Sequence, residues 1–355
     1  MAQNDHSSIS KPHSHKTVAQ KDKILNIVGW DVYADPKNRN KTIGYKAFEQ
    51  KSGYIVNFIP LNNLDDIISY AESHHDIDLL IISNEGIEML LNMNLVKPLS
   101  TSLISHYQDL HHNLKYTKWG HFNGNVYAVP WAWGPTGLLY DQDKIKEPTS
   151  WNIFWDPKFR YQSSIWDDVS MIWITALSLG YKNVYNLTQN QLEQIKIKLF
   201  QLNDLMYDYY GGEQEVFDLL LSGKIIITNS WFDPSGRLKN HHKNFKMVIP
   251  KEGAVGMFDS YILSQNSSKE AIAHQFIDHQ ISPVTQLLMS QITGLSPANI
   301  ETLSLMTQDE IKGLHLDEQD YFSKMILWDI MPRKHLYDQL LKDVQQDFSR
   351  KQQKR

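Results

Sequence analysis

Aromatic side chains and carboxylates recur together where predicted strands begin or end. The set consists of Trp30, Tyr33, Glu85, Trp131, Trp133, Asp167 or Asp168, Trp231 and Asp259. Ring faces attract cations, and carboxylates accept charge-assisted hydrogen bonds from ammonium groups. Lys and Arg are not in excess around these residues. A site of this composition favours a cation that carries apolar methylene groups, and an alkyl amine meets that description.

Two of these aromatic residues lie in an apolar crossing that spans residues 125–140. Pro130 and Pro135 cannot donate ladder hydrogen bonds and restrict the residues before them. They therefore predict an extended connection between two strands, and not a helix or a central strand. Trp131 and Trp133 inside it could fill a core or form the floor of a ligand cleft between two lobes. The cleft is the hypothesis that the rest of the chain tests.

The first part of the chain must position the N-terminal members of the set. Strands are predicted at residues 23–33, 54–61 and 76–83, with helices at 43–52 and 64–71 between them. This βαβαβ order predicts a doubly wound parallel sheet, in which ligands bind outside the carboxyl ends of the strands. The residues at those ends are Trp30, Asp31, Tyr33, Ser83, Asn84 and Glu85.

The second part predicts another α/β unit. Residues 161–168 form a strand that ends in Asp167 and Asp168, of which one caps the helix at 171–180 and the other is free to face a ligand. The buried strand at 224–229 leads to Trp231. Residues 247–250 form the strand back, and the stretch from residue 258 returns to the first lobe. Further helices are predicted at 188–206, 213–221, 269–280 and 283–291, and residues 301–355 are predicted to be helical.

Length and composition exclude several classes of protein. At 355 residues with 41% hydrophobic content, the chain suits two globular domains, and a net charge of -5 with scattered basic residues does not suit nucleic-acid binding. There is no cysteine, so disulfides and thiol chemistry are excluded. No apolar run is long enough for a spanning helix.

Residues 1–23 are polar and predicted to be disordered. They lack the apolar core of a signal peptide, so either the protein stays in the cytoplasm or a natural leader has been removed.

Metal binding and catalysis are weaker interpretations of the same residues. Tyr209 and Tyr210, and the histidine pairs that begin at His74, His111 and His241, invite a metal, but adjacent residues do not face one another on a strand or helix. Paired acids could suggest glycoside hydrolysis, yet two neighbours on one segment cannot straddle a bond. We expect no cofactor and no enzymatic activity.

The order of several short motifs resembles the periplasmic spermidine/putrescine-binding proteins, the substrate-binding receptors of ABC importers. The resemblance covers roughly residues 24–348. Its landmarks are GWDVY at 29–33, DLLIIS at 78–83, VPWAWG at 129–134, TSW at 149–151, WDPKF at 155–159, and PKEG at 250–253 followed by Asp259 and Ser260.

The resemblance implies a two-lobe, type II-like α/β fold with a ligand cleft between the lobes. Lobe 1 would comprise residues 24–132 and 254–300, and lobe 2 residues 133–253 and 301–355, with crossings near Trp133, Gly253 and Ile300. Trp30 and Tyr33 would be wall aromatics, Ser83 a strand-end hydroxyl, and Asp168 and Asp259 the carboxylates that bind ammonium groups.

Departures from the family pattern concern the ligand. Thr228, Met257 and Leu295 replace aromatic residues, Met171 replaces a carboxylate, and Glu85 and Asp329 stand where Tyr and Gln are common. Another amine, an opine-like or amino-acid-derived ligand, or a metal therefore remains the alternative to a polyamine, and Arg237 or Arg333 would accept the carboxylate of a zwitterion. The resemblance further implies a periplasmic, monomeric protein whose partner is an ABC permease in the inner membrane.

Overall fold

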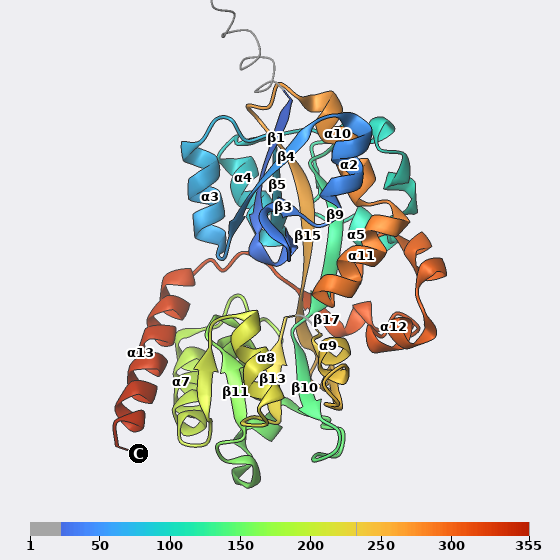
Figure 1. Ribbon diagram of the computed structural model, residues 1–355. Helices are drawn as coiled ribbons and strands as arrows, with labels where there is room; N and C mark the ends of the chain where they lie inside the picture. The colour runs from blue at the N-terminus through green and yellow to red at the C-terminus, as the bar shows by residue number, and fades with distance from the viewer. Residues whose placement is uncertain (1–22, 232, 355) are drawn as a thin grey trace, which may run out of the picture.

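The computed structural model describes residues 23–231 and 233–354, so the predicted disordered tail lies outside the described residues except for Lys23. Two α/β lobes are stacked along the long axis of the molecule, with a few strands passing between them (Figure 1). Each lobe has its own sheet, and helices lie on both sides of it.

The first lobe is built on a mixed sheet whose strand order is β16-β9-β15-β5-β1-β4. The three strands predicted to be parallel are parallel, with β1 between β4 and β5. The strands are β1 (Ile24–Trp30), β4 (Ile55–Leu61), β5 (Leu79–Ser83), β9 (Ala128–Pro135), β15 (Ala254–Ser264) and β16 (Ser296–Pro297), and β6 (Val96–Lys97) adds to β15.

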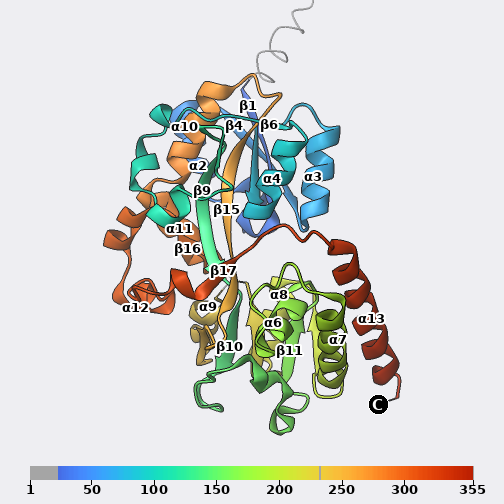
Figure 2. The same cartoon turned by 180° about the vertical axis from the view of Figure 1, so that it is seen from behind.

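Helices cover this sheet on both faces, with α3 (Leu64–Ser73) and α4 (Asn84–Asn92) on one side and α10 (Glu270–Gln280) and α11 (Pro283–Thr293) on the other (Figures 1 and 2). Local signals set their ends. The side chain of Asn63 accepts a hydrogen bond from the backbone of Asp66 and caps α3. Helix α2 (Tyr45–Ser52) ends at Gly53, whose φ of 70° suits glycine. The remaining short elements are β2 (Ala34–Asp35), β3 (Asn38–Thr42), α5 (His112–Lys115), β7 (His121–Phe122) and β8 (Asn125–Val126).

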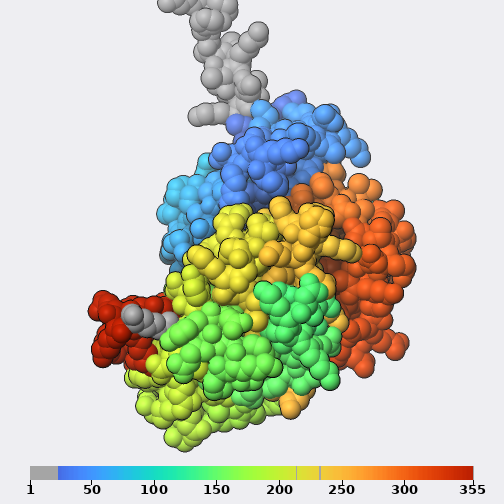
Figure 3. All heavy atoms as spheres, turned by 60° about the horizontal axis from the view of Figure 1, so that its bottom comes forward, coloured from blue at the N-terminus to red at the C-terminus, as the bar shows by residue number. Residues whose placement is uncertain are grey.

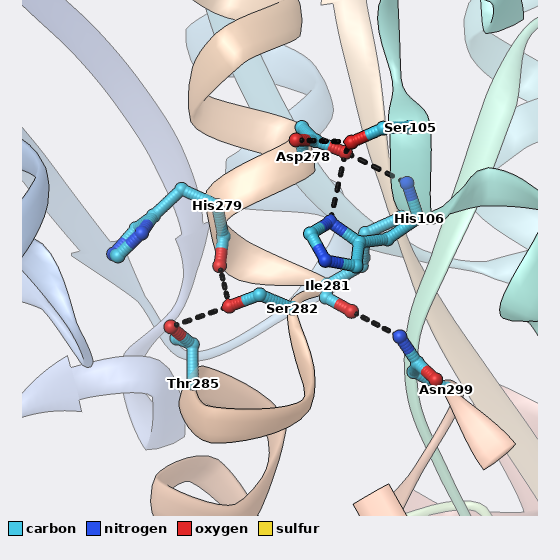
Figure 4. A network of polar contacts seen from close by, with 8 residues as sticks. All are labelled: Ser105, His106, Asp278, His279, Ile281, Ser282, Thr285 and Asn299. Carbon is cyan, nitrogen blue, oxygen red and sulfur yellow. Dashed lines mark hydrogen bonds and ion pairs between the residues drawn. The ribbon is translucent and has the colours of Figure 1, made fainter. Parts of the chain in front are cut away.

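A polar cluster on the first lobe attaches the segment around Ser105 to helix α10. Asp278 of α10 accepts hydrogen bonds from the Ser105 hydroxyl and the His106 backbone at 2.9 and 2.8 Å (Figure 4). Asn299 donates to the carbonyl of Ile281 at 2.7 Å. Burial opposes the charge on Asp278, but the hydrogen bonds outweigh it and hold its pKa below the usual value. These groups satisfy one another, so the cluster anchors the 3-10 helix η3 (Ser105–Asp109) and has a structural role.

The second lobe has the strand order β12-β11-β13-β10-β14. Thr188 forms a capping box with Gln191 at the start of α7, where the sequence predicted a helix to begin. The strands are β10 (Gly137–Asp141), β11 (Ser163–Trp166), β12 (Asp208–Tyr210), β13 (Ile227–Ser230) and β14 (Phe245–Val248), and the helices are α6 (Ser170–Ser178), α7 (Gln189–Asn203), α8 (Glu213–Leu221) and α9 (Ser235–Lys239).

Three segments connect the lobes. Strand β9 runs on into β10, β15 returns, and the third segment is β17 (Met325–Leu327), which is parallel to the start of β15. The sequence placed this third crossing around Ile300, but Ile300 begins the 3-10 helix η6 (Ile300–Leu305) on the first lobe, followed by α12 (Gln308–Gly313). The prediction that residues 301–355 are helical missed β17, because three apolar residues carry no periodic signal.

The long C-terminal helix α13 (Lys334–Gln352) lies along α7 at the edge of the second lobe (Figures 1 and 3). An ion pair of 2.6 Å between Lys196 and Asp343 joins the two helices. Tyr337 is fully buried and donates its hydroxyl hydrogen to the carbonyl of Val184. Helix α13 is therefore an integral part of the second lobe.

The crossing that holds Pro130 differs from its prediction in one respect. It is extended, but it is also a paired strand, because β9 lies between β15 and β16. The register of β9 with β15 shifts between Asp259 and Ser260, and Pro130 lies opposite Ser260. The irregular pairing accommodates a residue that has no N–H to donate.

Candidate functional site

Asp259 is the central acid of the first lobe. It lies on β15 and is only 3% exposed, and the hydroxyl of Tyr33 donates a hydrogen bond to its carboxylate. The Trp30 indole N–H also approaches it, although without hydrogen-bonding geometry. Burial raises the pKa of Asp259 to about 7, against the lowering effect of Tyr33 and Trp30. The structure thus brings three of the predicted site residues together at one sheet edge.

Glu85 lies beside this group, in the first turn of α4 directly after β5. Ser83 donates its hydroxyl hydrogen to Oε1 of Glu85 at 2.9 Å, and Ser83 is the residue opposite Asp259 in the ladder between β5 and β15. Oε2 is buried and meets no hydrogen-bond donor. Burial, with a smaller contribution from the carboxylates of Asp259 and Asp329, raises the pKa of Glu85 to about 8, against the lowering effect of the backbone and Ser83 hydrogen bonds.

Asn84 has a different role from its neighbours. Its side chain is fully buried, donates to the carbonyl of Trp328 and accepts from the backbone N–H of Phe258. Both ends of the amide are therefore occupied by backbone groups. Asn84 ties β5 to the third crossing segment, which positions Trp328 against the site.

Asp168 is the corresponding acid of the second lobe. Its Oδ2 accepts a hydrogen bond from the Trp231 indole at 2.8 Å, and its Oδ1 accepts one from the backbone of Ser170 at 2.8 Å. Burial raises the pKa of Asp168 to about 6. The exposed Asp167 instead accepts from Gln345 on α13. The sequence assigned capping to one acid of this pair and ligand contact to the other. In the structure, Asp168 accepts from the backbone of Ser170 in the first turn of α6, whereas Asp167 is turned toward α13.

A group of aromatic rings packs around Trp328, which directly follows the third crossing segment. Trp328 makes edge contacts with Trp231 and Trp173, with ring centroids 4.9 and 5.4 Å apart, and Tyr185 packs on Trp173 at 5.2 Å. Burial raises the pKa of Tyr185, and the nearby carboxylates of Glu85 and Asp329 add to this rise. Tyr185 of the second lobe therefore lies close to Glu85 of the first. No periodic signal pointed to Trp173 or Tyr185, because they lie within an apolar helix and a loop.

The two indoles that the sequence placed at the cleft floor are core residues. Trp131 is fully buried and packs edge-on against Tyr33 at 5.8 Å, so it supports the site from behind. Trp133 donates its N–H to the carbonyl of Pro297 and packs on Phe322 at 5.4 Å. Trp133 is 4% exposed because the rings of His111, Tyr321 and Phe322 pack around it, so the structure places it in the core and not at a cleft floor.

Several other predicted residues have partners of their own. Asp31 is 43% exposed and forms an ion pair with Arg39 at 2.9 Å, and Asp329 pairs with Lys118 at 2.6 Å. Thr228 is fully buried in β13, where its hydroxyl donates to the carbonyl of Asn229.

Met257 is 8% exposed and lies opposite Gly134 in the ladder. The two arginines considered for a zwitterion contact other groups, since Arg237 lies over the Phe217 ring and Arg333 donates to Asn186.

A small cavity adjoins Trp231 between the lobes. It has a volume of only about 10 Å³, and both lobes and the C-terminal segment contribute to its walls. Apolar groups dominate the lining, which consists of Gly134, Pro135, Trp231, Met247, Gly294, Leu295, Ser296, Leu314 and Tyr321. Leu295, where the family pattern has an aromatic residue, is part of it. Trp231 therefore contacts both this apolar space and the carboxylate of Asp168.

The electrostatic balance of the site is negative. Asp168, Glu85 and Asp259 form no ion pair with any cation in the described chain, residues 23–231 and 233–354. Charges buried without partners are costly, which explains the raised pKa values. Within the same residues, no group of three or more His, Cys, Asp or Glu side chains could hold a metal ion. The geometry suits an organic cation.

Comparisons with known proteins agree with this architecture. The putrescine-binding periplasmic protein PotF of Escherichia coli (strain K12) is 23% identical over 286 residues, which cover 75% of each chain. A putrescine/agmatine-binding protein of Pseudomonas aeruginosa is 21% identical over 310 residues, which cover 82% of this chain and 83% of that protein. Among solved structures, a putative spermidine/putrescine ABC transporter from Listeria monocytogenes superimposes with a TM-score of 0.78 at 20% identity, covering 91% of this chain and 99% of that one.

The two-lobe binding-protein fold predicted from the sequence is confirmed by this superposition. None of the helices in the described part of the chain has the length and apolar character needed to cross a membrane. A family model described as bacterial extracellular solute-binding protein matches residues 76–325. Since this match spans well over half of the sequence, the chain belongs to the bacterial extracellular solute-binding proteins, a family of receptors and not of enzymes.

Proposed function

We propose that this receptor binds an aliphatic polyamine between its lobes and serves an ABC importer. The names of the two curated relatives, a putrescine-binding and a putrescine/agmatine-binding protein, support a diamine-like ligand. The chemistry of the site supports the same class independently, because it combines carboxyl groups with aromatic ring faces.

The observation that carries the proposal is the pair formed by Asp168 and Asp259. These acids come from different lobes, both are held by side chains of aromatic residues, and neither has a cation partner among the described residues. An ammonium group at each would supply the missing positive charge. The rings of Trp231 and Trp328 between them would cover the methylene groups.

The mechanism is closure of the lobes around the ligand. A ligand that touches both lobes stabilises the closed arrangement by its higher affinity for that arrangement. Strands β9 and β15 and the segment at β17 connect the lobes and are the elements that a hinge motion must bend. Closure removes water from the ammonium groups, so each must gain carboxylate or carbonyl acceptors in exchange.

The cellular setting belongs to the same proposal. We infer that the receptor acts in the periplasm as a monomer and delivers its ligand to a permease in the inner membrane. Relatives named as periplasmic proteins support this location.

Calorimetric titration with putrescine and spermidine tests the proposal. Asp168→Asn and Asp259→Asn should each weaken binding by at least about 30-fold, since removing one member of a buried charge pair costs about 2 kcal/mol or more. Asp167→Asn is the matched control, because this neighbouring acid is exposed and faces α13. Unchanged affinity in both site variants, or an equal loss in the control, would refute the assignment.

A further inference from the structure

Glu85 carries an acceptor atom that has no hydrogen-bond partner within residues 23–231 and 233–354. Its Oε1 accepts from the Ser83 hydroxyl, whereas Oε2 is buried and has no hydrogen-bond partner. A carboxylate oxygen that is removed from water and meets no donor is costly. The group must therefore either hold a proton or receive a donor from outside the protein.

The surroundings of Glu85 offer no positive charge. From β15 it faces Asp259, whose carboxylate is held by Tyr33, and after β17 it faces Asp329, which Lys118 already pairs at 2.6 Å. From the second lobe it faces the hydroxyl-bearing ring of Tyr185. The ion pairs within residues 23–231 and 233–354 do not include Glu85.

The number of carboxyl groups in the site, compared with the number of ammonium groups on the ligand, distinguishes diamines from triamines. Among the described residues, three carboxyl groups of the site have no cation partner: Asp259 is buried, and Asp168 and Glu85 are partly buried. A diamine brings two ammonium groups, which match the acids of the proposed function. A triamine brings a third, and Oε2 of Glu85 is the free acceptor that remains for it.

We propose that Glu85 is the residue that distinguishes triamines from diamines: it keeps a proton while a diamine is bound and releases that proton when a third ammonium group donates to Oε2. This inference rests on the proposed function and goes beyond it by assigning the third contact and its proton. The O–H bond of Glu85 breaks, its proton passes to the buffer, and an N–H of the amine takes its place.

Burial supports the protonated starting state, since the pKa of Glu85 is raised to about 8 and the group is mostly neutral at pH 7. In that state the free oxygen bears an O–H and not a negative charge. A third ammonium group restores the negative charge of Glu85. Its electrostatic attraction to the carboxylate exceeds the desolvation cost that otherwise keeps Glu85 protonated.

Calorimetry at pH 7 in phosphate and in Tris measures the released protons, because the two buffers differ in ionisation enthalpy. Spermidine should release about one proton more than putrescine from the unmodified receptor. Glu85→Gln, which keeps the acceptor for Ser83, should abolish this difference and weaken spermidine binding about tenfold more than putrescine binding. Glu88→Gln, at an exposed position of the same helix, should behave as the unmodified receptor.

Each result decides between the alternatives. Equal proton release for the two amines in the unmodified receptor would overturn the inference without any variant. A difference that persists in Glu85→Gln would assign the proton to another acid and also overturn it. Both results leave the proposed function intact, as does failure of spermidine alone to bind, which would overturn only this inference. Failure of both amines to bind would overturn the proposed function and this inference together.

Discussion

Replacing Asp259 by Asn should stabilise the empty receptor at alkaline pH. Asp259 is 3% exposed and has no cation partner in the described chain, so its negative charge opposes folding. Asparagine has the same shape, and its carbonyl oxygen can still accept the hydrogen bond from Tyr33. The variant therefore removes the charge with little change in packing.

The magnitude follows from the pKa of Asp259, which rises from 3.8 in the unfolded chain to about 7 in the folded protein. Between these values the folded state holds a proton that the unfolded state has lost, so the free energy of unfolding falls as pH rises from about 4 to about 7. At about 1.4 kcal/mol per pKa unit, the full loss above pH 7 is about 4 kcal/mol. The amide of Asn lacks a partner for its N–H groups, which reduces the expected gain to about 2 kcal/mol.

Urea unfolding of the ligand-free protein at pH 5 and pH 8.5 measures this effect. Asp259→Asn should be more stable than the unmodified protein by about 2 kcal/mol at pH 8.5 and should differ little at pH 5. Asp167→Asn controls for the loss of one negative charge at an exposed position. The measured quantity is the difference in free energy of unfolding between the Asp259 variant and the unmodified protein. If this difference were no larger at pH 8.5 than at pH 5, the reasoning that burial of the Asp259 charge destabilises the fold would be refuted.

Three further substitutions test individual contacts. Trp231→Phe removes the indole N–H that reaches Asp168 at 2.8 Å and should weaken amine binding about tenfold in calorimetry, because a hydrogen bond to a charged group contributes about 1.5 kcal/mol. Gly294→Ala should lower the free energy of unfolding in urea by about 2 kcal/mol, since φ is 71° and the added Cβ would lie 2.4 Å from the carbonyl oxygen of Asp233. Thr188→Ala should lower it by about 1 kcal/mol by removing the capping box of α7.

Each of these has an outcome that contradicts its premise. Unchanged amine affinity in the Trp231 variant would show that Asp168 does not need the indole to hold the ligand. If Gly294→Ala were as stable as the unmodified protein, the turn at Gly294 would have to relax around a methyl group. If Thr188→Ala were as stable, α7 would start equally well without its threonine.

Much of the first lobe could be predicted from the sequence. The strands that end at Trp30 and Ser83 and the helix that closes at Gly53 carry local signals, namely apolar runs, caps and a left-handed glycine. Because parallel strands end at the same sheet edge, the neighbourhood of Trp30, Tyr33 and Glu85 followed from strand order alone.

Other parts of the site could not be predicted, because they depend on which face a side chain presents. Asp167 and Asp168 are adjacent in sequence, yet one contacts α13 and the other Trp231. Trp133 was expected at the cleft floor but is covered by neighbouring rings. Tyr185 approaches Glu85, and Trp328 contacts the adjacent Asn84, from segments with no recognisable pattern.

The sequence by itself determined the local elements, the absence of thiol chemistry and the presence of acids and rings at strand ends. Only the tertiary structure decided which acidic side chains are buried and which form ion pairs. The hydrogen bond between Tyr33 and Asp259 joins residues 226 positions apart, and the pKa of Asp259 depends on that bond and on burial. Periodicity acts over a few residues, whereas desolvation and charge depend on every group that folding brings near, so the chemistry of this site arises from the packing of distant segments.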